Sequence, residues 1–348
     1  MLETAFAAAL GAACLALIAW GARTLPGERW QFIASAPRRR GESGEWEGLN
    51  LTFYGFFFAT STTIGIAMAL ILLGSIGVPS GEMLAIAAAI AALALPAARW
   101  MVRMVEMQNH GFTIGGASFV GVVGAPWIVA GLNIAFPNAF DTPVVPALAA
   151  FAVAYAFGEG LGRMACMSFG CCYGKPIAVC PAWMQPVLRR IAFVFRGSTK
   201  KASYESGFEG VPLIPIQAMT SLVCVGVGVI SLRLFLAERF AAALLAAITA
   251  TQLWRCASEF LRADYRGAWR FSAYQWMSLG MTAYVWAAVY LIPFQAASPA
   301  NLAQGLSRLS SPIALLALQG LWIGVFLYTG RSSVTASRLS FHLLPHRH

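Results

Sequence analysis

The sequence predicts an all-α polytopic membrane protein, and three observations carry this prediction. Hydrophobic residues make up 59% of the 348 residues and charged residues only 11%, whereas a soluble domain has about 25% charged residues. The apolar runs have the length of membrane-spanning helices rather than the ten-residue alternation of a barrel strand. The net charge of +10 is compatible with nucleic-acid binding, but the basic residues lie between the apolar runs, where they orient spans or meet anionic lipid. We therefore expect no nucleic-acid partner.

Nine apolar runs are long enough to span a membrane at about 20 residues per span. They begin near Ala5, Leu51, Met83, Gly115, Pro146, Pro215, Phe240, Gln275 and Pro312. The first run has neither the basic leader nor the cleavage site of a signal peptide, so we expect a retained span. A basic connector before the second run and a polar segment over about 175–210 are the main stretches outside the membrane.

The distribution of lysine and arginine predicts the orientation. When the loops alternate between two sides, the side of the basic connector collects 21 of the 24 basic residues and the other side three. The positive-inside rule makes the basic side cytoplasmic. The N-terminus is then expected outside and the C-terminus inside.

Two charged residues close the fifth run. Glu159 and Arg163 are four residues apart, on one helical face at membrane depth, where a charge costs roughly 2.5–3.5 kcal/mol and is normally paired or functional. Gly162, Gly170 and Gly174 then permit tight turns and close approach of a ligand. A cation beside bare backbone suits an anionic lipid headgroup. The alternative is a helix end with one internal ion pair.

The end of the seventh run carries a second charged group. Arg255, Glu259 and Arg262 have the spacing of one helical face. Two arginines at one depth are able to hold a phosphodiester through paired N–H donors, and Glu259 either orients an arginine or acts as a general base. The alternative role for each arginine is a positive-inside anchor, which we favour for residues 38–40, Arg266 and Arg270.

The remaining candidates are glycines, one histidine and cysteines. Gly115 and Gly116 open the fourth run and permit close approach of a helix or ligand, and His110 just before them is a candidate base, although a single interfacial histidine is more often a surface residue. Cys171, Cys172 and Cys180 lack a nearby histidine or fourth cysteine, so we expect no metal and no cofactor. The vicinal pair indicates a close-packed turn, and a periplasmic loop would permit a disulfide to Cys180.

Taken in order, six motifs resemble those of the prolipoprotein diacylglyceryl transferase family of bacterial inner membranes. They cover roughly 51–291 and comprise Phe53-Tyr54-Gly55, the Gly-Gly-x-Ser-Phe stretch from Gly115 to Gly121, Gly162-Arg163 with the turn to Gly174, Pro215-Ile216-Gln217, Arg255-x-x-x-Glu259-Phe260-x-Arg262, and Gln275 with Ser278. The resemblance implies a seven-helix core over 49–297. An extra transmembrane helix and basic connector would occupy 1–48, and an extra helix and polar tail 298–348.

The resemblance also implies a reaction. The family transfers the diacylglyceryl group of phosphatidylglycerol to a cysteine thiol of a prolipoprotein and releases glycerol phosphate. The partners implied are an anionic phospholipid and a prolipoprotein, and the implied location is the bacterial inner membrane. By the same resemblance the catalytic residues would be Arg163, Arg255, Glu259 and Tyr54, and substrate would also meet Cys166, Gly170, Gly115, Gly116, Gln217, Arg262 and Gln275.

Several positions depart from the family pattern. Val120 stands where the family has the histidine of Gly-Gly-x-Ser-Phe-His-Gly, Cys166 where it has asparagine, and Ile214 where a histidine precedes Pro-x-Gln. The family site faces the periplasm, whereas the charge count places these motifs on the cytoplasmic side. Two alternatives follow: the same donor chemistry with a non-lipoprotein acceptor, or a catalytically silent phospholipid-binding or scaffold protein.

Overall fold

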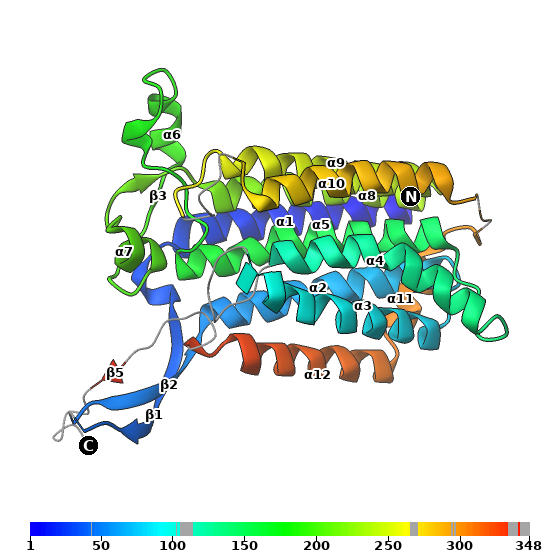
Figure 1. The fold of residues 1–348 in the computed structure, drawn as a ribbon, viewed down its shortest axis with the longest axis horizontal. Coiled ribbons are helices and arrows are strands. Elements are labelled where there is room, and N and C mark those ends of the chain that lie inside the picture. The colour runs from blue at the N-terminus through cyan, green and yellow to red at the C-terminus, as the bar shows by residue number, and fades with distance from the viewer. Residues whose placement is uncertain are drawn as a thin grey trace.

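In the computed structural model the chain folds into a bundle of long helices with nearly parallel axes (Figure 1). The structure describes residues 1–42, 44–101, 103–104, 114–264, 271–293, 295, 297–332 and 340–341. Each of the nine apolar runs forms a long helix, as predicted. These helices are α1 (Leu2–Thr24), α2 (Phe53–Ser75), α3 (Ser80–Met101), α4 (Ile114–Ala135), α5 (Val144–Phe169), α8 (Ile216–Leu236), α9 (Phe240–Glu259), α10 (Ala273–Leu291) and α12 (Pro312–Thr329).

Eight of these helices are long and apolar enough to cross a membrane. The ninth, α10, is less apolar because it carries Gln275, Ser278, Thr282 and three tyrosines. It nevertheless packs along α9 and α4 within the bundle. The chain is therefore a multi-pass membrane protein of the all-α class.

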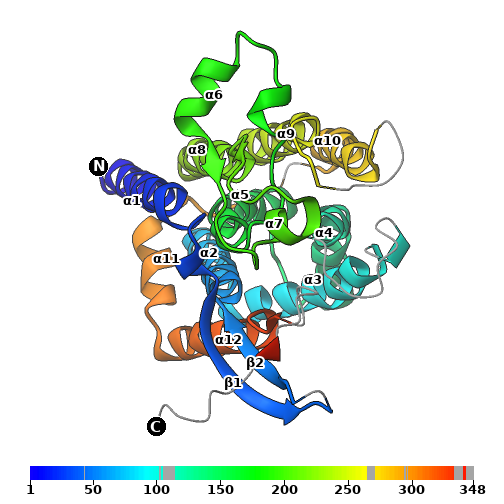
Figure 2. The ribbon, with the colours of Figure 1, turned by 90° about the vertical axis from the view of Figure 1, so that its left-hand side faces the viewer.

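Helix α5 lies near the middle of the bundle when the molecule is viewed along the helices (Figure 2). It packs against α2, α8 and α9, and most of its residues are buried. Small residues allow these close contacts, because a Cβ added at Gly65 of α2 would lie 3.3 Å from the Ala154 carbonyl oxygen. A Cβ at Gly160 would lie 2.9 Å from a methyl group of Val225 in α8. Close packing of small residues replaces the hydrophobic driving force that helices lack in lipid.

The basic connector folds as a β-hairpin, which the sequence reasoning did not foresee. Strand β1 (Phe32–Arg40) pairs antiparallel with β2 (Trp46–Thr52), and β5 (Ser340–Phe341) adds to β2. Pro37 and the three arginines that follow it interrupt the alternation of apolar and polar residues that would predict a strand. Helix α2 begins at Phe53, two residues later than expected, because the Thr52 hydroxyl accepts the Gly55 backbone N–H at 3.4 Å.

The polar segment after α5 folds back over the end of the bundle. It contains the short elements η3 (Ile177–Val179), α6 (Gln185–Ile191), β3 (Phe193–Val194), α7 (Lys201–Ser206) and β4 (Pro212–Leu213). Strands β3 and β4 pair antiparallel, with Phe193 opposite Leu213. The buried Tyr173 hydroxyl donates to Glu205 at 2.9 Å and so joins the end of α5 to α7.

The two ends of the bundle differ in charge. Residues 38–40 on β1 and Arg189 and Arg190 on α6 lie at the end that is on the left in Figure 1. Arg308, on the short helix α11 (Leu302–Leu309), lies at the opposite end, where it donates to the Gly77 carbonyl at 3.4 Å. Which end faces the cytoplasm remains a prediction from the charge count.

Helices α11 and α12 are fixed to α2 by glycines. A Cβ added at Gly305 would lie 2.1 Å from the Ile71 carbonyl oxygen, and one at Gly55 would lie 2.1 Å from Gly330 Cα. Both contacts involve backbone, which cannot rotate away as a side chain can. The C-terminal helices therefore depend on glycine at these two contacts.

We predict that Gly305→Ala destabilises the detergent-solubilised protein by about 1–3 kcal/mol, the usual range for overpacking. Gly320→Ala on α12 is the matched control, because an added Cβ there meets no atom within 4 Å. Thermal unfolding of both variants checks this. Equal melting temperatures for the two variants would contradict the packing of α11 on α2.

Candidate functional site

Two arginines meet one buried carboxylate near the end of α5. Arg163 donates from Nη2 to Glu159 Oε1 one helical turn away, as the spacing predicted. Arg255 of α9 approaches the same oxygen with Nη1 at 3.8 Å. The side chains of Arg163 and Arg255 are each 12% exposed and that of Glu159 is 5% exposed. Two guanidinium groups and one carboxylate leave one net positive charge inside an apolar bundle, where an unpaired charge is costly.

Arg255 retains hydrogen-bonding capacity. Its Nη1 atom is buried and has no hydrogen-bond acceptor among the described residues. Its guanidinium group lies over the Tyr274 ring, 5.9 Å from the centroid. A buried N–H group without an acceptor is uncommon in folded proteins. Charge and hydrogen bonding therefore both favour an anion beside Arg255.

The glycine pair of the fourth helix meets this arginine. A Cβ added at Gly115 would lie 2.4 Å from Arg255 Nη2 and 2.9 Å from the Tyr274 ring. Gly116 is buried beside it. The bare backbone at the start of α4 thus lets the guanidinium group come close, a contact that the glycine spacing alone did not specify.

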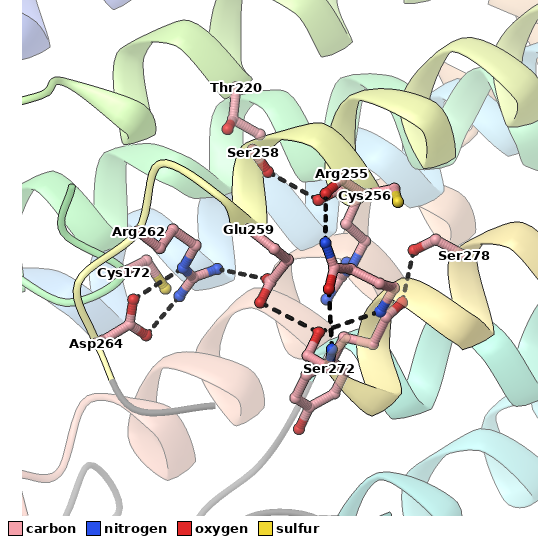
Figure 3. Close-up of polar contacts among 12 residues, drawn as sticks. Cys172, Thr220, Arg255, Cys256, Ser258, Glu259, Arg262, Asp264, Ser272 and Ser278 are labelled. Atoms are coloured by element: carbon pink, nitrogen blue, oxygen red, sulfur yellow. Dashed lines mark hydrogen bonds and ion pairs between the residues drawn. The ribbon is translucent and has the colours of Figure 1, made fainter. Parts of the chain in front are cut away.

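Arg262 is occupied by acidic partners. It makes a two-pronged contact with Asp264, with N–O distances of 2.8 and 2.6 Å, and a third bond to Glu259 at 3.4 Å. Glu259 also accepts the Ser272 hydroxyl at 3.5 Å (Figure 3). Arg262 with two carboxylates carries one net negative charge, so its hydrogen bonds stabilise the residues that follow α9. Its contact with substrate stays a prediction.

Two glutamines and a glycine position backbone around the cluster. Gln217 donates to the Cys171 carbonyl at 2.8 Å. Gln275 donates to the Cys256 carbonyl at 3.1 Å and completes a capping box with Ser272, which joins the end of α9 to the start of α10. Gly170 ends α5 with a φ of +75°, in the left-handed region that favours glycine.

Tyr54 lies on α2, and Cys166 lies on α5 together with Glu159 and Arg163. The Tyr54 ring packs against Phe58 and Phe169, with centroid distances of 6.1 and 5.6 Å. Cys166 is buried one turn beyond Arg163. His110, Arg266 and Arg270 lie outside the described residues.

A cavity of about 470 Å³ leads away from the charged cluster between α2, α3, α4 and α5. Its walls are almost entirely apolar, and Glu159, Arg163 and Cys166 line it together with Ser61 and Ser118. The volume falls within the usual range of about 300–1,000 Å³ for ligand sites. The cavity therefore has mostly apolar walls and is also bordered by the Glu159–Arg163 ion pair.

A second, small cavity of about 10 Å³ connects Glu159 and Arg163 with Arg255 and Arg262. It has room for about one water molecule. Thr220 and Ser258 also line it. The α5 and α9 charges thus share one small polar space, which is separate from the larger apolar cavity although Glu159 and Arg163 line both.

These features define a polytopic helical membrane protein with an arginine–carboxylate cluster bordering an apolar cavity. The family model for prolipoprotein diacylglyceryl transferase matches residues 45–292, so the chain belongs to this family, as the motifs indicated. The matched residues run from β2 through α10, and α1 and α12 lie outside them. No curated protein matches the sequence.

The sequence does not indicate the structural role of Lys200, because this residue lies in the polar segment and not within an apolar run. This side chain is fully buried and donates to the Leu25 carbonyl at 3.1 Å and to the Ser168 carbonyl at 2.5 Å. It thereby ties the polar segment to the ends of α1 and α5. Burial lowers the pKa of Lys200 to about 7.

We predict that the melting temperature of the wild-type protein gains a contribution from Lys200 as the pH rises from about 7 toward 10.5. In that range the unfolded lysine holds its proton and the folded one has lost it, so stability rises with pH. Lys200→Met should remove this contribution, whereas Lys175→Met, at an exposed position, should retain it. Identical pH profiles for wild type and Lys200→Met would refute the assignment.

Proposed function

We propose that the protein transfers the diacylglyceryl group of phosphatidylglycerol to an acceptor thiol, with a prolipoprotein cysteine as the expected acceptor. The observation that carries this proposal is the net positive cluster of Glu159, Arg163 and Arg255 beside the apolar cavity. Family membership supports transferase chemistry in a membrane. The proposed setting is the bacterial inner membrane.

The donor lipid fits both parts of the site. Acyl chains would occupy the apolar cavity, whose walls offer few competing polar groups. The phosphodiester has one negative charge, which would neutralise the excess charge of Arg163 and Arg255. Arg163 lines the apolar cavity and would meet the phosphate from there. Arg255, with its Nη1 lacking an acceptor, lines only the small polar space beside it, so its bond to a phosphate oxygen requires that this space widens when the lipid binds.

The charge balance of the reaction also favours these arginines. The acceptor thiol would release its proton to water, and its sulfur would attack the glyceryl carbon that carries the phosphate. The carbon–oxygen bond would break, and glycerol phosphate would leave with the electron pair. Negative charge then grows on the phosphate oxygen. Buried donors placed before the reaction stabilise such charge more strongly than water does.

A second function is favoured by one residue. Val120 replaces the motif histidine and lies half-buried on α4, between the cavity-lining residues Ser118 and Gly121. A valine cannot accept a proton. A protein that binds anionic phospholipid without transferring it, or that serves a different acceptor, would retain the arginines and tolerate this change.

We predict that Arg255→Gln lowers glycerol phosphate release from phosphatidylglycerol vesicles by about 100–1,000-fold, the usual loss when one buried donor to a developing anion is removed. Arg255→Lys should also be impaired because lysine lacks the planar fork. The control is Arg190→Gln, at an exposed position on α6. Wild-type rates in Arg255→Gln and Arg163→Gln would refute the headgroup site.

Complementation separates the acceptors. Rescue of a bacterial strain depleted of its lipoprotein transferase would support a prolipoprotein acceptor. Failure of a well-expressed protein that still releases glycerol phosphate would indicate another acceptor. Failure with neither rescue nor release, while phosphatidylglycerol remains bound, would leave the lipid-binding function.

A further inference from the structure

Three cysteine sulfurs come together where α5 ends. Cys166 lies in the last turn of the helix, and the Gly170 N–H donates to its carbonyl at 2.8 Å. The left-handed Gly170 reverses the chain, so that Cys171 and Cys172 return toward Cys166. The three Sγ atoms all lie within 4.8 Å of one another, and those of Cys166 and Cys172 are 3.9 Å apart.

Neighbouring elements hold this turn in place. Gln217 of α8 binds the Cys171 carbonyl, and the Ala263 N–H donates to the Tyr173 carbonyl at 3.1 Å. Cys172 has a φ of +54°, a conformation that costs a non-glycine residue energy and persists where the surroundings enforce it. The sulfurs are therefore brought together by a fixed backbone and not by flexible side chains alone.

The arrangement suits tetrahedral coordination by thiolates. A Zn–S bond of about 2.3 Å places the sulfurs of a tetrahedral site roughly 3.8 Å apart, close to the 3.9 Å between Cys166 and Cys172. Cys180, which the sequence grouped with the vicinal pair, instead contacts the Pro176 carbonyl at 3.8 Å. Within the described ranges no histidine or further cysteine joins the group.

We propose that Cys166, Cys171 and Cys172 bind one zinc ion and leave its fourth position open. Thiolate ligands select zinc or cuprous copper. Three thiolates with Zn²⁺ carry one net negative charge, whereas with Cu⁺ they carry two. The smaller charge favours zinc, because Arg262 beside this turn already pairs with Glu259 and Asp264.

The proposed zinc site borders the apolar cavity through Cys166. Cys166 lines that cavity together with Glu159 and Arg163, and Cys172 lies beside Arg262 in Figure 3. Cys171 and Cys172 are only half-buried, so a fourth ligand from outside has access. Catalytic zinc sites have the same composition of three protein ligands and one exchangeable position.

This location suggests a use that rests on the proposed transferase function. An acceptor thiol would lose its proton to water on binding zinc, because zinc binds the thiolate form. Its sulfur would then attack the glyceryl carbon, and the electron pair of the broken carbon–oxygen bond would leave with glycerol phosphate. The thioether formed is a weaker ligand and would dissociate. Zinc would thus activate the acceptor thiol, a role that Val120 cannot fill because valine cannot accept a proton.

The test begins with metal analysis of the full-length protein purified in detergent after growth with zinc. We expect about one zinc per chain, the content of a single site, and thiolate-to-metal charge-transfer absorption after cobalt substitution. Cys166→Ser, Cys171→Ser and Cys172→Ser should each lose bound metal, whereas Cys180→Ser and Cys256→Ser should keep it. No metal above that of the triple serine variant, copper in place of zinc, or a disulfide within the group would overturn the proposal.

A second measurement, cysteine alkylation, uses the wild-type protein and therefore does not require that the serine variants fold. In the wild-type protein, zinc should slow alkylation of Cys171 and Cys172, and a chelator should restore it, while Cys256 reacts at the same rate in both states. Arg255→Gln should retain zinc even though transfer is lost. Transferase activity without zinc would overturn this inference alone, and bound zinc without transferase activity would overturn only the proposed function.

Discussion

Arg163 and Arg255 both form ion pairs with the single carboxylate of Glu159, deep among the packed helices. These charges lie inside an apolar bundle, where each is costly unless paired. Glu159 and Arg163 belong to the central helix α5, and Arg255 reaches them from α9. Small residues at Gly160 and Gly115 keep the surrounding helices close enough for this contact.

One face of α5 organises the proposed chemistry. Glu159, Arg163 and Cys166 are spaced as i, i+4 and i+7, which places them on one side of the helix, and all three line the apolar cavity. In the proposed reaction Glu159 orients Arg163, the two arginines would bind the phosphate, and Cys166 lies toward the end of α5 where an acceptor would enter. The polar segment anchored by Lys200 covers that end. Donor and acceptor sites would thus follow one another along a single helix.

Much of this arrangement follows from the sequence. Apolar run lengths predicted all nine long helices, and the four-residue spacing predicted the pair between Glu159 and Arg163. Such features depend on local periodicity, which a single sequence records. The ordered motifs also identified the family before the fold was known.

Other features depend on contacts between segments far apart in the chain. Whether Glu259 pairs with Arg255 or with Arg262 is decided by Asp264 and Ser272, which fix the turn after α9. The approach of Gly115 to Arg255 requires the packing of α4 against α10 and α5. The grouping of Cys166 with Cys171 requires the reversal of the chain at Gly170. The spacing of charged residues and the number of cysteines do not predict these contacts.

In the proposed donor complex an anionic phospholipid binds with its phosphate at Arg163 and Arg255 and its acyl chains in the apolar cavity. Photocrosslinking with phosphatidylglycerol that carries a photoreactive acyl chain tests this most directly. We expect label on cavity residues such as Ile66 and Ile90. Excess phosphatidylglycerol should reduce this label, excess phosphatidylcholine should not, and Arg255→Gln should abolish it. Label confined to outward-facing residues such as Trp127 and Ile313, with no preference between the two competitors, would contradict it.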